Sequence, residues 1–172
     1  MNTLDIIILV LILIPAFLGL KNGLLRSVFS LLGIITGLFL ATRFHDKAAS
    51  VFSFLKLEPR LLGIITFIAI ILLCYFIFVY LAGKISRFNV VTKTFDKLLG
   101  VILGILKGLI IASLFLILTT NTFNIFAKET IVSSRFYPVI VNIAPEVYNY
   151  VKQFFPNAKG FYEELNNLIF RV

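Results

Sequence analysis

Lys107 is the residue of this sequence most able to do chemistry, because it is a cation inside an apolar segment. It lies ten residues into a hydrophobic run that begins at Leu98, where a charge costs about 3 kcal/mol or more. Its aliphatic stem could carry the ammonium group to an interface or a hydrated cavity. Alternatively, the ammonium could line a conduction path or form an ion pair within an oligomer. Asp96 lies eleven residues away, about 16 Å along a helix, so it cannot be the partner on the same helix.

Three glycines share the helix face of Lys107. Gly100, Gly104 and Gly108 recur at four-residue spacing, so they drift by only about 80° around a helix axis, and Lys107 falls within about 20° of Gly100. Small residues at this spacing let two helix backbones approach closely in lipid. We therefore predict that this face packs against protein. A second pair repeats the spacing and predicts a second packing face: Gly33 and Gly37.

The other ionisable groups near the apolar runs are few and do not form a catalytic set. Asp5 stands at the start of the first run and Asp96 just before the last, and we interpret both as intramembrane or interfacial polar residues. His45 is the only histidine and has no Cys or carboxylate cluster around it, so neither a Ser/His/Asp set nor a zinc site is indicated. A phosphate-binding glycine loop is also missing. The sequence predicts no enzymatic activity, no metal and no cofactor.

The composition assigns the chain to the membrane. Hydrophobic residues make up 60% of it and the mean hydropathy is +1.04, whereas water-soluble domains are about 45–50% apolar. The net charge of +8 could suggest nucleic acid in a soluble protein. Here the Lys and Arg residues lie mostly between apolar runs, as in membrane-flanking loops, so we expect a lipid bilayer and no nucleic acid as partner.

Four apolar runs predict an all-α membrane protein with four transmembrane helices. A hydrocarbon core of about 30 Å requires about 20 helical residues, and the runs lie at about 4–20, 24–41, 61–82 and 98–118. Together they form a predicted transmembrane domain, residues 1–118. Pro15 inside the first run either kinks a helix that lines a cavity or is tolerated because neighbouring groups satisfy the freed carbonyl.

The segment between the first two runs predicts a tight helical hairpin. It reads G-L-K-N-G-L-L-R and is barely long enough to reverse the chain. Gly23 can adopt a positive φ, and basic side chains mark the membrane surface. Its candidate residues are Gly19, Lys21, Gly23 and Arg26.

Two further regions are amphipathic. Residues 42–60 mix aromatic and charged side chains and predict a short interfacial helix, with His45 as a solvated loop residue. Residues 119–172 predict an amphipathic helical tail at the membrane surface or capping the bundle, with one helix after Pro138 and a second at about Phe161 to Phe170.

The number of basic residues does not decide the topology. Residues 19–26 and 83–97 carry six Lys or Arg on one side, and the opposite loops also carry six. The density of charge close to the bilayer favours the first set as cytoplasmic, which would put both termini outside.

Two motifs resemble the colicin V production protein (CvpA) family of bacterial inner-membrane proteins. The first family motif reads roughly G-x-x-R-G-x-x-R-E, and here Asn22 replaces its first basic residue and Ser27 its acidic residue. The second reads D-R-x-L-G-x-x-x-G-x-x-R/K-G, shortly after a threonine, and the sequence T-F-D-K-L-L-G-V-I-L-G-I-L-K-G from Thr94 to Gly108 is similar to it. The resemblance extends over about residues 1–155, including an S-x-F-x-P stretch before the tail helix.

The resemblance implies a multi-pass inner-membrane protein that supports colicin V production or export and envelope integrity. The resemblance implies relatives that carry a trypsin-like protease after the last span, outside the cytoplasm, which also favours external termini. Glycine faces suggest a homo-oligomer. Two alternatives remain: a channel or transport component with a polar path at Lys107, and a scaffold that recruits envelope proteins as partners.

Overall fold

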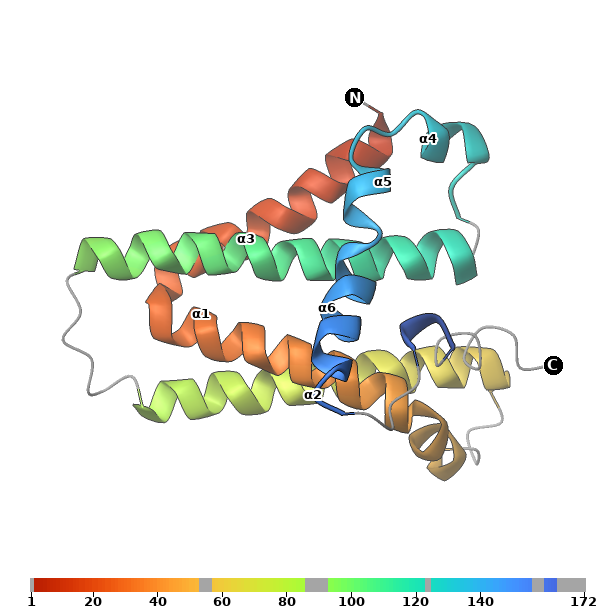
Figure 1. The fold of residues 1–172 in the computed structure, drawn as a ribbon, viewed down its shortest axis with the longest axis horizontal. Coiled ribbons are helices and arrows are strands. Elements are labelled where there is room, and N and C mark those ends of the chain that lie inside the picture. The colour runs from red at the N-terminus through yellow and green to blue at the C-terminus, as the bar shows by residue number, and fades with distance from the viewer. Residues whose placement is uncertain (1, 53–56, 86–92, 123–124, 156–159, 164–172) are drawn as a thin grey trace. The chain divides into compact units, whose positions relative to one another are not determined.

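The computed structural model describes residues 2–52, 57–85, 93–122, 125–155 and 160–163, and these residues form helices joined by turns, with no strand among them. Three helices are long and apolar enough to cross a membrane. They are α1 (Thr3–Val51), α2 (Pro59–Ile85) and α3 (Lys93–Ile117) (Figure 1). The prediction of an all-α membrane protein is therefore confirmed.

A single residue interrupts the 49-residue helix α1. Gly23 has φ 75° and ψ −178°, and it is the one positive-φ glycine among the described residues. The helix axis turns sharply there (Figure 1). Glycine suits this position because a left-handed φ is strained for residues with a Cβ. The predicted use of Gly23 in the turn is thus observed, and the helix continues without a break through Pro15.

The chain after α3 forms short helices. A π-helical turn, η3 (Leu118–Thr122), continues α3. It is followed by α4 (Lys128–Val132), α5 (Tyr137–Ile140) and α6 (Ile143–Lys152). Pro138 stands in the first turn of α5, where its missing N–H costs nothing.

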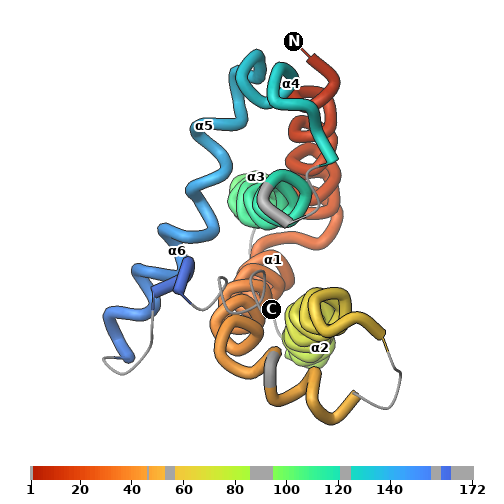
Figure 2. The backbone as a smooth tube through the Cα atoms, turned by 90° about the vertical axis from the view of Figure 1, so that its right-hand side faces the viewer, coloured from red at the N-terminus to blue at the C-terminus, as the bar shows by residue number. Residues whose placement is uncertain are grey.

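The contacts divide the chain into two compact units. Unit 1 comprises Met1–Leu31 and Leu81–Ala144, and unit 2 comprises Leu32–Tyr80 and Pro145–Val172. The predicted transmembrane domain, residues 1–118, and the predicted tail, residues 119–172, stay predictions. In unit 1 the first arm of α1 lies beside α3 (Figures 1 and 2). Its hydrophobic core joins α1, α3 and α5 through five buried residues: Leu4, Ile8, Ala112, Leu116 and Ile140.

In unit 2 the second arm of α1 lies beside α2 (Figure 2). Gly33 approaches the backbone of Tyr75, and Gly37 approaches that of Ile71, so the two helices run antiparallel. Phe39 of α1 stacks on Tyr148 of α6, with ring centroids 5.7 Å apart, and Tyr148 in turn contacts Phe161 at 5.5 Å. These aromatic contacts hold the tail helix α6 on the unit.

The prediction for residues 42–60 was wrong. The structure shows α1 running on to Val51 and α2 beginning at Pro59, rather than a separate interfacial helix. His45 is therefore helical and only 1% exposed, not a solvated loop residue. It falls on the same helix face as Leu38 and Ala41, and its Nδ1 lies 3.0 Å from the carbonyl oxygen of Ala41. The second predicted tail helix is helical from Phe161 to Glu163, and its remainder lies outside the described residues.

Candidate functional site

The three glycines of α3 lie against the first arm of α1. At each of them an added Cβ would meet backbone atoms of α1, so the helices touch where side chains are missing. The register is antiparallel: Gly100 lies against Gly19, Gly104 against Pro15 and Ala16, and Gly108 against Leu11 and Ile12. In lipid, close backbone contact of this kind is a main source of helix association. The face with the predicted glycines is therefore used inside the chain.

Lys107 lies on this packed side of α3 and is 2% exposed. Its Nζ donates a hydrogen bond of 3.2 Å to Oγ of Ser30, on the second arm of α1. The direction is the one expected of a helical side chain, because Cα–Cβ bonds tilt toward the helix N-terminus. The ammonium thus reaches back toward the end of the helix that carries Asp96. Ser30 in turn donates to the carbonyl oxygen of Ser27 at 2.9 Å.

Ser27 adds a second buried hydroxyl on the same helix face, one turn before Ser30. It is 2% exposed, and its Oγ has no hydrogen-bond partner among the described residues. Buried hydroxyls are usually paired with protein or ordered water. The two serines and Lys107 form a short polar region between two mostly apolar segments, the second arm of α1 and α3. Nothing in the sequence pattern indicated the relation of these serines to the lysine.

Asp96 caps the second arm of α1 from a different helix. Its Oδ1 accepts a hydrogen bond of 2.8 Å from the backbone N–H of Leu24. Leu24 follows the non-helical Gly23, so its N–H is among the first donors of the new arm and lacks an acceptor within that arm. A carboxylate is also favoured at this positive end of a helix. A Cβ on Gly23 would collide with the Asp96 carboxylate, which gives glycine a second reason to stand there.

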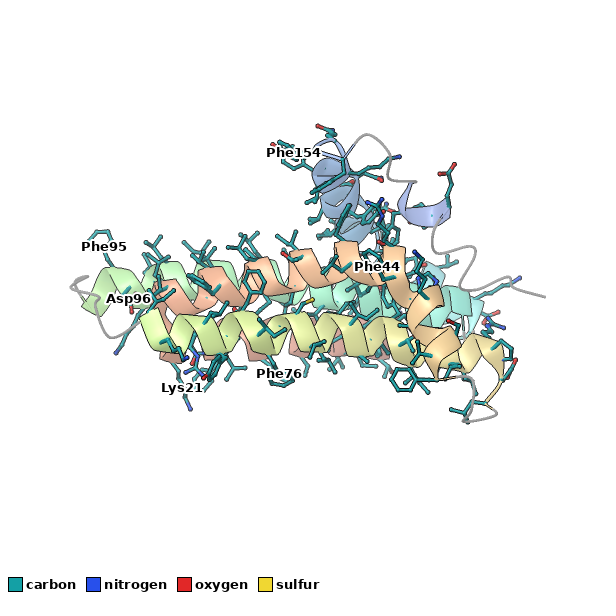
Figure 3. The ribbon with its side chains drawn as sticks, turned by 90° about the horizontal axis from the view of Figure 1, so that it is seen from below. Lys21, Phe44, Phe76, Phe95, Asp96 and Phe154 are labelled. Atoms are coloured by element: carbon teal, nitrogen blue, oxygen red, sulfur yellow. The ribbon has the colours of Figure 1, made fainter. Side chains whose placement is uncertain are left out.

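The basic hairpin residues lie on the outside of this contact. Lys21 and Arg26 are exposed, and Nζ of Lys21 lies 4.9 Å from the ring centroid of Phe17. Figure 3 shows Lys21 and Phe95 pointing outward at the end where Asp96 lies. The side chain of Thr94, part of the resemblance, lies outside the described side chains.

Asp5 connects the N-terminal end of α1, opposite the kink, to the tail. It is fully buried, and its Oδ1 accepts a hydrogen bond of 2.6 Å from Oγ of Ser134. Asn2 and Asp5 also cap the start of α1 reciprocally, with the Asn2 N–H donating to the carboxylate and the Asp5 N–H donating to the Asn2 side chain. The Asn2 amide donates to the carbonyl oxygen of Thr130 at 2.6 Å. Asp5 is thus a structural anchor for the tail.

A second polar contact fixes the tail on α3. The Ser113 hydroxyl donates to the carbonyl oxygen of Val141 at 2.8 Å and accepts from the N–H of Ala144 at 2.9 Å. It therefore satisfies backbone groups at the break between α5 and α6. Thr120 Oγ1 lies 3.3 Å from the hydroxyl of Tyr137. Small hydroxyl residues in apolar runs were the only sequence signal for these contacts.

The structure distributes the predicted polar residues over three places. The Lys107 ammonium lies between α3 and the second arm of α1, Asp96 lies at the hairpin end of α3, and Asp5 lies at the tail end of the first arm. Among the described residues no group of three or more His, Cys, Asp or Glu is placed to hold a metal ion. The arrangement is suited to holding helices and solvating a buried cation.

A comparison with protein families finds one whose description is colicin V production protein, and its model matches residues 4–145. This range includes all three long helices, the hairpin and the contacts of Asp5 and Ser113 with the tail. The comparisons with curated proteins and with solved structures find no match.

Proposed function

The chain belongs to the colicin V production protein family, and we propose that it supports the production or export of a colicin V-type toxin from within a bacterial inner membrane. The single observation that carries the proposal is the family match over residues 4–145 of a chain with three membrane-length apolar helices. No catalytic step is part of the proposal. The proposal includes a role in envelope integrity, which the family resemblance implies.

The proposed topology has four spans. The apolar part of α1, Thr3–His45, has 43 residues, which would be about 65 Å of helix, twice the thickness of a hydrocarbon core of about 30 Å. The kink at Gly23 divides it into two arms of nearly equal length, each able to cross once. Lys21 and Arg26 flank the kink, as expected at a membrane surface. With α2 and α3 this makes an even number of spans, so both termini lie on one side, which we propose to be extracytoplasmic.

A homo-oligomer would have to form through a surface other than the glycine face of α3, which the sequence suggested for this role. Gly100, Gly104 and Gly108 contact α1 of the same chain, so they are not available to a second copy. We propose that self-association, where it occurs, uses outward apolar faces such as that of α2, where Leu73 is 61% and Phe76 62% exposed. Cross-linking of cysteines introduced at these two positions tests this proposal.

A second candidate function is a channel or transport component. The observation that favours it is the buried Lys107 beside Ser30 and Ser27, because an ionisable residue within a membrane span is by default a candidate functional site. Recruitment of envelope proteins through α6, where Tyr150 is 66% exposed, is a third. In purified proteoliposomes, ion flux that Lys107→Leu abolishes would favour the channel, whereas silent vesicles would exclude it.

The main proposal is tested in a toxin-producing strain that lacks its own family member. Expression of this chain should restore toxin in the culture medium, measured as killing of a sensitive strain. Gly108→Leu should fail to restore it, because a side chain at this position would force α1 and α3 apart. Gly83→Leu is the matched control, because an added Cβ at Gly83 meets nothing within 4 Å. Full toxin release without the chain, or with Gly108→Leu folded in the membrane, would contradict the proposal.

A further inference from the structure

We propose that the hairpin end of unit 1 binds the phosphate headgroup of an anionic phospholipid. The site consists of Lys21, Arg26 and Lys97, which we call the basic rim. The three side chains come from three helical segments: the first arm of α1, its second arm and α3. The contact of Gly23 with Asp96 brings these segments together.

The three cations of the basic rim are exposed. No hydrogen bond or ion pair of Arg26 or Lys97 is found among the described residues, and the Lys21 ammonium lies over the Phe17 ring. Asp96, the carboxylate nearest in the sequence, already accepts the N–H of Leu24. Among the described residues, the rim therefore carries three exposed cations and one nearby carboxylate, that of Asp96, and has a net positive charge.

The sequence around the rim is also strongly basic. Residues 19–26 and 83–97 contain six Lys or Arg and a single acid, Asp96. Large apolar side chains stand beside the cations: Phe17 is 57%, Phe95 66% and Leu98 62% exposed. Figure 3 shows Phe95 and Lys21 projecting from the same end.

A lipid fits this combination better than a soluble anion does. Basic side chains at a membrane surface attract anionic headgroups, and long basic side chains keep their stems along apolar surface while the charge stays at the interface. Phe17 and Leu98 are exposed and lie on the membrane side of Lys21 and Lys97 in their helices, so they offer contact to the acyl chains. One phosphate group between Lys21, Arg26 and Lys97 would bridge the two arms of α1 and α3, so the lipid should also stabilise the kink.

The experiment titrates phosphatidylglycerol into the full chain in a neutral detergent and follows lipid adducts by native mass spectrometry. Phosphatidylglycerol should bind more tightly than phosphatidylcholine. Each neutralised rim residue should weaken binding about fivefold, so Lys21→Gln, Arg26→Gln and Lys97→Gln together should weaken it on the order of 100-fold. The triple variant Lys21→Arg, Arg26→Lys and Lys97→Arg should bind like the parent.

The matched control removes the same number of exposed charges elsewhere, through Lys47→Gln, Lys128→Gln and Arg135→Gln. It should change the affinity less than about fivefold. Equal losses in both glutamine triples would overturn the proposal, because total charge would then govern binding. Competition by inorganic phosphate as effective as that by the lipid would overturn it too. Helical circular dichroism of each variant verifies that it is folded.

Discussion

Replacing Gly108 by alanine tests whether the contact between α1 and α3 depends on the missing side chain. The added Cβ would lie 2.8 Å from Cα of Ile12 and 2.9 Å from its carbonyl oxygen. Carbon atoms in favourable contact are about 3.5–4.0 Å apart, so the two helices would have to separate by about 0.7 Å or more. Both atoms of Ile12 belong to helix backbone and cannot rotate away.

The expected cost follows from a comparison with a second glycine. Overpacking in a close-packed contact costs about 1–3 kcal/mol, while replacing a helical glycine by alanine gains about 0.5–1 kcal/mol. Gly83 lies in α2, and an added Cβ there meets nothing within 4 Å. Gly83→Ala therefore gains helix propensity without overpacking. The difference between the two variants removes the propensity contribution and should be about 1–3 kcal/mol.

The assay is a denaturant titration of the purified variants in mixed micelles, followed by near-ultraviolet circular dichroism of the tyrosines. Gly33→Ala adds an intermediate case, because its Cβ would lie 3.0 Å from Cα of Tyr75. The expected order of unfolding free energies is Gly83→Ala, then Gly33→Ala, then Gly108→Ala as the least stable. If Gly108→Ala were as stable as Gly83→Ala, the glycine contact between α1 and α3 would be refuted.

Three further predictions concern the polar residues. Asp96→Ala leaves the N–H of Leu24 without its acceptor and should cost about 1–3 kcal/mol of unfolding free energy, with a smaller loss for Asp96→Asn, in the same titration. Ser30→Ala should lower the unfolding free energy by about 1–3 kcal/mol, because the buried Lys107 ammonium loses the Ser30 hydroxyl as an acceptor. Adding Lys107→Met should recover part of this loss, because the buried ammonium is then gone. Additive losses in the double variant would show that the two residues do not interact. Asp5→Ala should free the tail and speed its cleavage by a protease added to the tail side of sealed vesicles, whereas a cleavage rate equal to that of the parent would contradict the anchoring role.

The sequence carried much of the information about the helices and less about their partners. Hydrophobic runs long enough for a bilayer predict spans because the requirement is one of length and composition. Glycine spacing points to a close helix contact because it concerns one face of one helix. Neither property says which helix lies opposite. Gly108 was therefore assigned to packing from the sequence, but its contact with Ile12 could only come from the structure.

Polar contacts across long sequence distances were the least predictable part. Lys107 was expected to need compensation, yet Ser30 is 77 residues away, and no local pattern connects them. His45 was misplaced for the opposite reason. The charged residues around it suggested solvent, but α1 continues through the segment and places the ring on the buried face. Where such a helix ends is determined by tertiary packing rather than by local composition.

The contacts in unit 1 fix α3 in one register along the first arm of α1. Asp96 holds the hairpin end through the N–H of Leu24, and Asp5 holds the tail end through Ser134. Between them, the glycines of α3 fit the α1 backbone at successive turns. Because the glycines recur at four-residue spacing, sliding α3 by one turn would place one glycine where its neighbour now lies, so the glycines alone do not set the register. The slide would break the contact of Asp96 with the N–H of Leu24. A function that slides α3 along α1 would therefore have to break this contact and that of Lys107 with Ser30.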